Sequence, residues 1–495
     1  MRDARPRLLA ATFALFVLLP FPSASVAQAG LGHLEDATLP PRGLLRVRGI
    51  TAWTRYDERF TSGGTELLGA PLTTDAFGVA TFAPLASIQS LIQAASGTPF
   101  TLSMGRSRFD ATGREEIVPM ALEYGITSRL ALGVMVPVVR KRIAQQFVLD
   151  STGANVGPNP ARTSSAASQL AAQLQAEFTN AQALLSGRLQ SCQSNPSGPG
   201  CATLLSRQAE AQALIQSSQT FASDVGALYG TSSTNGMAFV PRAQSAAQIA
   251  IAARIADFNT RYQDLLQSSA NFIVAVPRGA GGAPGSAQFQ SYLFNDLGRD
   301  SLTFRERIGI GDIEVGFRAG LIDHMSAGRL RGIRLTLASA VRLPTGSRQS
   351  PSDIADLRLG EGSYIVDSRI ALDSRTGRLG LLAVGDFAAN VHSNDTTNAS
   401  IRNTRWTEIQ LQPRWHLSES LAIHAAYSLR STDKFGGDQL VGGGISFSTL
   451  SAYRRGSRAH PIETRFTHLE AISGDAGRPK FFRDQIELRF YFRPR

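Results

Sequence analysis

Residues 309–322 read GIGDIEVGFRAGLI, and apolar and polar side chains alternate along this stretch. One set of alternate positions is mainly apolar and consists of Ile313, Val315, Phe317, Ala319 and Leu321. The other set is charged or glycine and consists of Asp312, Glu314, Gly316, Arg318 and Gly320. Successive side chains of a β-strand point to opposite faces, so a period of two is typical of a strand. The stretch therefore predicts a strand with one apolar and one charged face.

The same alternation recurs before residue 150 and after residue 300. The predicted strands lie near 45–56, 115–125, 130–141, 310–322, 332–343, 363–373, 379–391, 405–416, 421–431, 439–449, 462–472 and 483–492. Their number is even, as bacterial single-chain barrels require. The links between consecutive strands are alternately short and long. The two longest links, 57–114 and 142–309, fall at the same end of the predicted barrel. This arrangement is typical of a barrel with tight turns at one end and long loops at the other.

A soluble β-sandwich also alternates, with its apolar face inward, and is the alternative architecture. Segments of about 9–11 residues are long enough to cross a bilayer at a tilt. The chain also ends in an aromatic-rich alternating segment, 483–492, as outer-membrane barrels commonly do. We therefore predict an all-β transmembrane barrel of about 12 antiparallel strands, with a three-helix insertion. Trp53, Trp406 and Trp415 are predicted to form aromatic girdles at the membrane interfaces.

The first 29 residues are predicted to be a secretory signal peptide. Arg2, Arg5 and Arg7 precede an apolar stretch, 8–19, and small residues follow it. An uncleaved anchor is the alternative. Export predicts localisation in the outer membrane, with membrane lipid and the barrel-assembly machinery as partners. Residues 30–149 and 301–495 then hold barrel strands one to three and four to twelve.

Residues 150–300 are rich in Ala, Gln and Ser and carry apolar residues at helical spacing. Helices are predicted near 163–190, 202–228 and 243–268. The only cysteines, Cys192 and Cys201, flank a Pro/Gly turn, which favours a disulfide in an exported protein. A metal site there would need two further ligands. The insertion follows the third predicted strand, and links after odd-numbered strands lie opposite the periplasmic turns. This order predicts that the insertion is on the extracellular side.

The composition argues against several partners. The 495 residues carry a net charge of +11, but the basic residues are spread along the chain without a concentrated patch. Nucleic-acid binding is therefore not expected. The pattern also predicts no cofactor and no metal.

Three motifs resemble those of a known family. Residues 122–137 read LEYGITSRLALGVMVP, residues 309–316 read GIGDIEVG, and 343–346 read LPTG with Leu359–Gly360 and Gly362–Ser363 following. Together they are similar to outer-membrane transporters of the MetA pathway of phenol degradation, over about 300 residues. The resemblance implies a barrel without catalytic residues that passes a small organic or aromatic compound. The helical insertion departs from the family's pattern.

The charged faces of the predicted strands provide the candidate site. The candidates for the lumen wall are Asp312, Glu314, Arg318, Arg334, Arg342, Asp367, Arg369, Glu408, Arg414, Glu487 and Arg489. Such a wall selects polar or anionic solutes if it is hydrated, and is a plug if the charges fill the interior. We expect passive transport of a small solute. The alternative is a surface-binding or structural barrel that acts through the helical insertion and a surface partner.

An outer-membrane hydrolase is the third possibility. His424 and Ser428 lie on the same predicted face but four residues apart, roughly 13 Å along a strand. This separation is too large for a hydrogen bond between a nucleophile and its base. The sequence therefore does not predict an enzyme.

Overall fold

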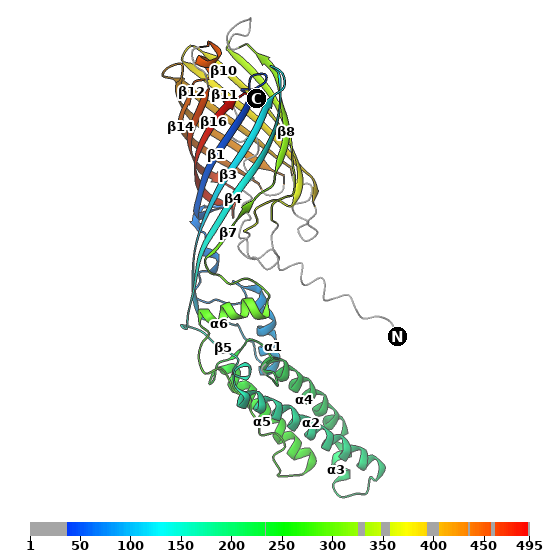
Figure 1. Cartoon of the computed structure of the whole chain (residues 1–495). Coiled ribbons are helices and arrows are strands. Elements are labelled where there is room, and N and C mark those ends of the chain that lie inside the picture. The colour runs from blue at the N-terminus through cyan, green and yellow to red at the C-terminus, as the bar shows by residue number, and fades with distance from the viewer. Residues whose placement is uncertain are drawn as a thin grey trace. The chain divides into compact units, whose positions relative to one another are not determined.

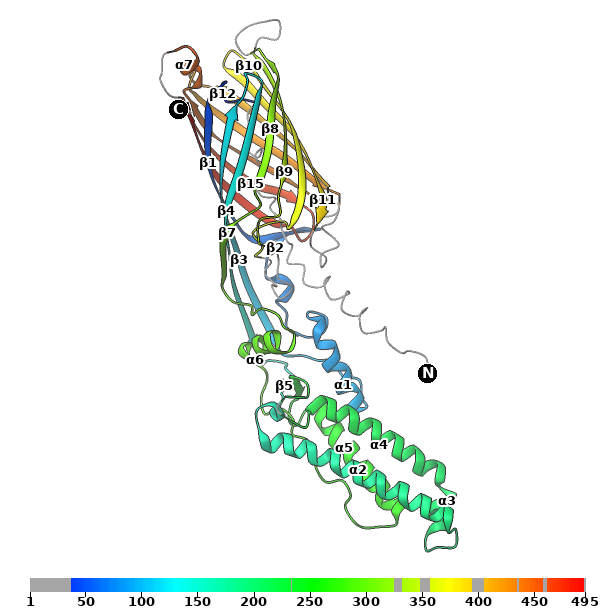
Figure 2. The ribbon, with the colours of Figure 1, turned by 45° about the vertical axis from the view of Figure 1, so that its right-hand side comes forward.

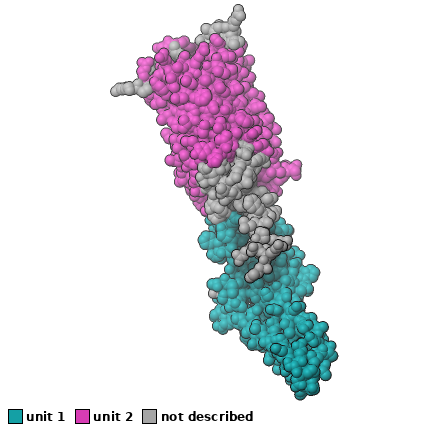
Figure 3. Space-filling model, turned by 90° about the vertical axis from the view of Figure 1, so that its right-hand side faces the viewer, with its two compact units in different colours: residues 1–19, 69–109, 147–301 teal, residues 20–68, 110–146, 302–495 magenta. Residues whose placement is uncertain are grey.

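The computed structural model describes residues 37–232, 234–324, 332–347, 357–393, 405–433, 436–456 and 461–493. The predicted signal peptide, 1–29, lies outside the described residues. Figure 3 colours two compact units. The described parts of residues 20–68, 110–146 and 302–495 form a barrel unit, and residues 69–109 and 147–301 form a helical unit.

The barrel unit is a closed antiparallel β-barrel (Figures 1 and 2). Within the described ranges its twelve strands are β1 (Leu45–Thr61), β3 (Arg106–Gly125), β4 (Leu130–Asp150), β8 (Glu314–Asp323), β9 (Ile333–Arg342), β10 (Ser363–Thr376), β11 (Leu379–Ser393), β12 (Arg405–His416), β13 (Leu421–Thr432), β14 (Gly436–Ser448), β15 (Ile462–Gly474) and β16 (Pro479–Phe492). The last strand pairs with the first, from Leu45 opposite Phe492 to Arg59 opposite Pro479. The predicted barrel of about 12 strands is confirmed.

The strand predicted at 310–322 begins later than expected. A short strand, β7 (Arg305–Ile310), pairs with β4 and ends before Asp312, and β8 begins at Glu314. The Asp312 carboxylate accepts hydrogen bonds from the backbone N–H groups of Gly346 and Glu361, at 2.8 and 2.6 Å. These bonds tie residues 311–313 to the link between β9 and β10 and interrupt the ladder. A further short strand, β2 (Gly64–Leu67), pairs with the end of β1.

The barrel strands expose their apolar face and bury their charged face. Leu132, Phe317 and Ile409 are 52%, 40% and 53% exposed, although they are large and apolar. Alternate positions on the same strands, such as Arg318 and Glu408, are 6% and 5% exposed. In a soluble sandwich the apolar side chains would instead be the buried ones. The barrel therefore has a hydrophilic interior and an outer surface suited to lipid.

The helical unit contains six α-helices among its described residues. They are α1 (Ala86–Ser96), α2 (Ser165–Ser194), α3 (Cys201–Ser206), α4 (Gln208–Tyr229), α5 (Ala246–Leu266) and α6 (Ser286–Ser291). Shorter elements are η2 (Ala70–Leu72), η3 (Ala83–Leu85), η4 (Pro160–Arg162), η5 (Tyr292–Asp296) and the strand pair β5 (Val156–Pro158) and β6 (Phe239–Pro241). The barrel unit adds one short helix, α7 (Leu450–Arg454).

The three predicted helices are present as α2, α3 with α4, and α5, whereas α1 was not predicted. Ser164 and Ser245 cap α2 and α5, because their side chains accept hydrogen bonds from backbone N–H groups of the first turn. Phe178, Phe221 and Phe258 pack together between α2, α4 and α5, with ring centroids 5.1–5.6 Å apart. This aromatic contact joins the three long helices around one core.

The helical unit also contains the predicted disulfide. Cys192 at the end of α2 is bonded to Cys201 at the start of α3. The bond closes the link between these two helices. No helix in the described ranges is both long and apolar enough to cross a membrane.

Candidate functional site

The two ends of the barrel differ in how the strands are connected. At one end, which we call the turn end, short links join β3 to β4 (126–129), β10 to β11 (377–378) and β12 to β13 (417–420). The other end, which we call the loop end, carries the links that contain the helical unit. The lumen between these ends is the candidate site.

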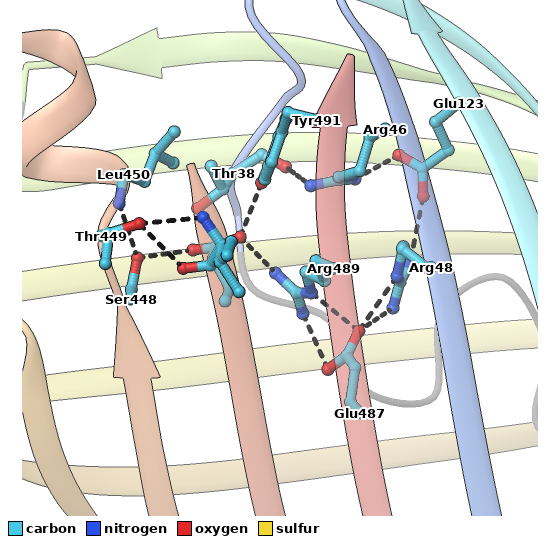
Figure 4. Close-up of polar contacts among 12 residues, drawn as sticks. Thr38, Arg46, Arg48, Glu123, Ser448, Thr449, Leu450, Glu487, Arg489 and Tyr491 are labelled. Carbon is cyan, nitrogen blue, oxygen red and sulfur yellow. Dashed lines mark hydrogen bonds and ion pairs between the residues drawn. The ribbon is translucent and has the colours of Figure 1, made fainter. Parts of the chain in front are cut away.

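A network of ion pairs lies on the inner face of the barrel wall near the turn end. We call Arg46, Arg48, Glu123, Glu487 and Arg489 the turn-end network (Figure 4). Arg46 forms an ion pair with Glu123, and Arg48 bridges Glu123 at 3.0 Å and Glu487 at 2.8 Å. Arg489 donates from Nε to Glu487 Oε1 at 2.7 Å. The network connects β3, β1 and β16 and so spans the seam that closes the barrel.

The chain before β1 fills part of the same region. The carbonyl oxygen of Thr38 accepts from Arg46 at 2.9 Å, and the Thr38 hydroxyl accepts from Arg334 of β9 at 3.1 Å. Thr336 of β9 donates to the Ala37 carbonyl at 2.6 Å, and Ala37 packs against Leu382 of β11. Ala37 and Thr38 therefore lie inside the lumen, hydrogen-bonded to β1 and β9 and packed against β11.

A pocket lies in the lumen near the loop end. It is lined by β12–β16, and we call it the loop-end cavity. Its polar lining includes Glu408, Gln412, Arg430, Arg483 and Gln485, and its inward apolar lining includes Leu440, Leu469 and Phe481. The cavity therefore offers charge, hydrogen-bonding groups and an apolar surface together, which is the usual composition of a small-molecule site.

A second, smaller pocket lies where the barrel wall is built from small residues. Gly133 of β4 is opposite Gly316 of β8, which is opposite Ala340 of β9. The lining includes inward charges such as Arg318 and the outward side chain of Phe317. The glycines let neighbouring groups approach closely here, since a Cβ at Gly316 would clash with the Ser339 carbonyl oxygen.

The structure buries most of the predicted lumen residues in the barrel interior. Glu314, Arg318, Arg334, Arg342, Asp367, Arg369, Glu408, Glu487 and Arg489 are all buried, and Arg414 is half-buried. Several form ion pairs with one another, including Arg342 with Glu314 at 2.7 Å and Arg369 with Asp386 at 2.6 Å. Asp312 is buried too, but it anchors the loop described above and is not part of a strand.

Sequence reasoning missed several charged residues of the interior. Arg46 and Arg48 are 0% and 1% exposed, and Glu123 and Arg483 are also buried. Arg46 and Arg48 alternate with Leu45 and Val47, so the period of two was a signal that could have identified them.

One of the three tryptophans contradicts the predicted girdle. Trp53 and Trp415 are exposed on the outside of the barrel, as expected. Trp406 is only 9% exposed and packs with Ile365 and Ala388. The alternation along β12 places it on the same face as Glu408, so it points inward beneath Arg430.

The residues considered for a hydrolase do not form a nucleophile–base pair. The Ser428 hydroxyl donates to Glu408 at 2.7 Å, and His424 Nε2 contacts the Thr467 hydroxyl at 3.1 Å. They thus bond to different partners: Ser428 bonds to the neighbouring strand β12, and His424 reaches past β14 to β15. The described residues also contain no cluster of three or more His, Cys, Asp or Glu side chains that could hold a metal.

Comparison with known proteins gives only distant likenesses. No family model matches the sequence, and no curated protein matches it. An outer membrane channel from Pseudomonas putida F1 is similar at a TM-score of 0.38 and 11% identity, over 93% of this chain and 99% of that chain. The P. putida toluene transporter TodX is similar at a TM-score of 0.26 and 11% identity, over 95% of this chain and 93% of that chain. The Ralstonia pickettii toluene transporter TbuX reaches 0.26 at 8% identity, over 96% and 98%. Likenesses at these TM-scores do not by themselves establish a common fold, so the assignment of the barrel rests on its own strand pairing.

Proposed function

We propose that this chain is an outer-membrane channel through which a small organic solute crosses passively. The observation that carries the proposal is the inversion of polarity in a closed barrel: apolar side chains cover its outside, and charged side chains line its inside. An apolar belt suits a lipid bilayer, and a charged interior suits a path for solutes.

In this proposal the turn end faces the periplasm and the loop end, with the helical unit, faces outward. Short periplasmic turns and long external loops are the rule for barrels of this kind. The loop-end cavity would then receive the solute first. Barrel-assembly machinery would insert the chain, and the surrounding lipid would contact its outer face.

The solute class is taken from the motif resemblance to transporters of the MetA pathway of phenol degradation. That resemblance favours a small organic or aromatic compound. The apolar patch formed by Leu440, Leu469 and Phe481 in the loop-end cavity supports the same choice, because it can contact a hydrocarbon group.

Reconstitution tests the proposal. The full chain, refolded into lipid vesicles, should let small organic solutes enter, and should give discrete conductance steps in a planar bilayer. A version that lacks residues 163–268 is the second sample, because it tests the barrel without its three long helices. If neither version conducts or admits solute, the channel is refuted, and a surface-binding barrel that acts through its helices becomes the better explanation.

A further inference from the structure

Two arginines in the loop-end cavity have no carboxylate partner among the described residues. Arg430 of β13 stacks over Trp406 with its guanidinium carbon 5.8 Å from the ring centroid, and Arg483 of β16 lies 5.3 Å from that of Phe481. Arg483 donates one hydrogen bond, from Nε to the Thr54 hydroxyl at 3.0 Å. The nearby acids are engaged elsewhere: Glu408 accepts from Ser428, and Asp438 pairs with Arg478 at 2.8 Å.

This arrangement differs from that of the turn-end network, where each arginine contacts a carboxylate. Glu408 and Asp438 lie opposite Arg430 in the ladder, but neither forms a direct ion pair with it or with Arg483 in the described ranges. A buried cation without a direct ion-pair partner is stabilised further by a bound anion or by water. Arg483 is 9% exposed and Arg430 is half-buried, and both line the loop-end cavity. The pair is therefore placed to attract a small anion, and guanidinium groups suit a carboxylate especially well.

Two glutamines supply a second, independent observation. Gln412 of β12 and Gln485 of β16 are 6% and 3% exposed and line the same cavity. Within the part of the chain that the structure describes, the side-chain oxygen of each lacks a hydrogen-bond partner. A buried acceptor without a donor loses stability, so these oxygens would be satisfied by a ligand that carries a hydroxyl group.

We propose that the loop-end cavity binds a small hydroxylated organic carboxylate. Arg430 and Arg483 hold the carboxylate, Gln412 and Gln485 accept from the hydroxyl, and Leu440 and Phe481 contact the hydrocarbon part. The proposal rests on the proposed function in one respect, since it assumes that solute reaches the lumen. It goes further because it specifies an acidic solute and the residues that recognise it.

Calorimetric titration of the full, folded chain in detergent and low chloride tests this with 4-hydroxybenzoate as the probe. Its methyl ester lacks the charge and benzoate lacks the hydroxyl, so both should bind more weakly, the ester by about tenfold or more. Chloride titrated alone distinguishes an inorganic anion site. If the ester binds as well as the acid, or if chloride competes fully at equal concentration, the proposal is overturned.

Variants locate the site. Arg430→Gln with Arg483→Gln should weaken 4-hydroxybenzoate about tenfold or more, whereas the charge-preserving Arg430→Lys with Arg483→Lys should retain part of the affinity. Gln412→Leu with Gln485→Leu should remove the preference for 4-hydroxybenzoate over benzoate. Arg455→Gln is the matched control, because Arg455 is 55% exposed and pairs with Glu419 on a link at the turn end. Unchanged affinity in the double glutamine variant of the arginines would overturn the assignment.

The outcome separates this inference from the proposed function. Conductance without selective binding of the acid refutes the binding site and leaves the channel standing. Binding of the acid without conductance supports the site and refutes the channel. A gel assay of heat-modifiable mobility establishes that each variant is folded before it is titrated.

Discussion

Arg48 of β1 and Arg489 of β16 lie directly opposite each other in the register that closes the barrel, and both donate to the same carboxylate, Glu487. Two like charges face each other across the seam and share this anion, while Arg48 also pairs with Glu123 at 3.0 Å and Arg489 with Glu463 at 3.5 Å. Glu487 is 1% exposed, so water contributes little to that compensation. Glu487 is thus the carboxylate that the two opposed arginines of the seam share.

Glu487→Gln should destabilise the barrel, because it leaves Arg48 and Arg489 facing each other without their shared anion. Removal of one partner of a buried ion pair costs about 3–5 kcal/mol. Guanidinium unfolding in lipid vesicles, followed by tryptophan fluorescence, measures the loss. Glu419→Gln is the control, since that carboxylate is 66% exposed and should cost less than about 1 kcal/mol. Equal midpoints for the two variants would contradict the role of Glu487.

Replacing residues 37–41 with glycine and serine of the same length should increase single-channel conductance. The substitution removes the apolar contact of Ala37 with Leu382 and the hydrogen bond of the Thr38 hydroxyl with Arg334. The segment would then be held mainly through the backbone carbonyls of residues 37 and 38, and so less firmly in the turn end of the lumen. Planar-bilayer recordings compare the mean conductance with that of the unaltered chain. A conductance that stays the same would show that the segment does not limit the path.

Ile409→Arg should destabilise the barrel in lipid. Ile409 lies within β12, is 53% exposed, and is on the face proposed to contact lipid. An arginine near the middle of the bilayer costs about 2–4 kcal/mol, whereas one near the interface costs about 0–1 kcal/mol. Leu379→Arg, at the first residue of β11, is therefore the matched control. Unfolding in vesicles measures both, and a neutral effect of Ile409→Arg would favour an outer surface in water.

The helical unit should lose stability as the pH rises from about 10 to about 12. Burial raises the pKa of Tyr292 to about 12, and the charge of Asp296 adds to the increase. The folded state thus favours the neutral phenol of Tyr292. The stability that this phenol contributes is complete below its ordinary pKa of 10 and is lost as the pH rises through the raised pKa. Circular dichroism at 222 nm follows the transition. Tyr292→Phe should move it to higher pH, and Tyr124→Phe, on the barrel surface, should not.

The period of two predicted the barrel well because every strand needs apolar side chains on its outer face and polar side chains on its inner face. This is why the face that holds Glu314, Arg318 and Glu408 could be predicted from the sequence. Alternation alone does not say how far a strand continues or where it stops. Asp312 fits the pattern of β8, yet its hydrogen bonds to the backbone of Gly346 and Glu361 end the ladder. That interruption depends on residues more than 30 positions away.

The candidate binding groups could be predicted only in part. Arg430 and Gln412 alternate with apolar neighbours and were recognisable as inward residues. Their lack of partners could not be predicted, because it depends on which carboxylate each neighbouring strand places within reach. Glu408 and Asp438 both lie opposite Arg430 in the ladder, and neither forms an ion pair with it in the described structure. Helix α1 was missed for a different reason, since its 11 residues follow a long stretch without clear periodicity.

The lumen is filled unevenly along its axis, with Ala37 and Arg46 packed near one end and the loop-end cavity near the other. A tube of this form has a vestibule on one side and a constriction close to the opposite mouth. Permeant ions accumulate in the vestibule before they reach the constriction, but they do not accumulate on the narrow side. Current through the protein should consequently be larger at one polarity of voltage than at the other, so that a single inserted molecule behaves as a rectifier and reveals its own orientation in the bilayer.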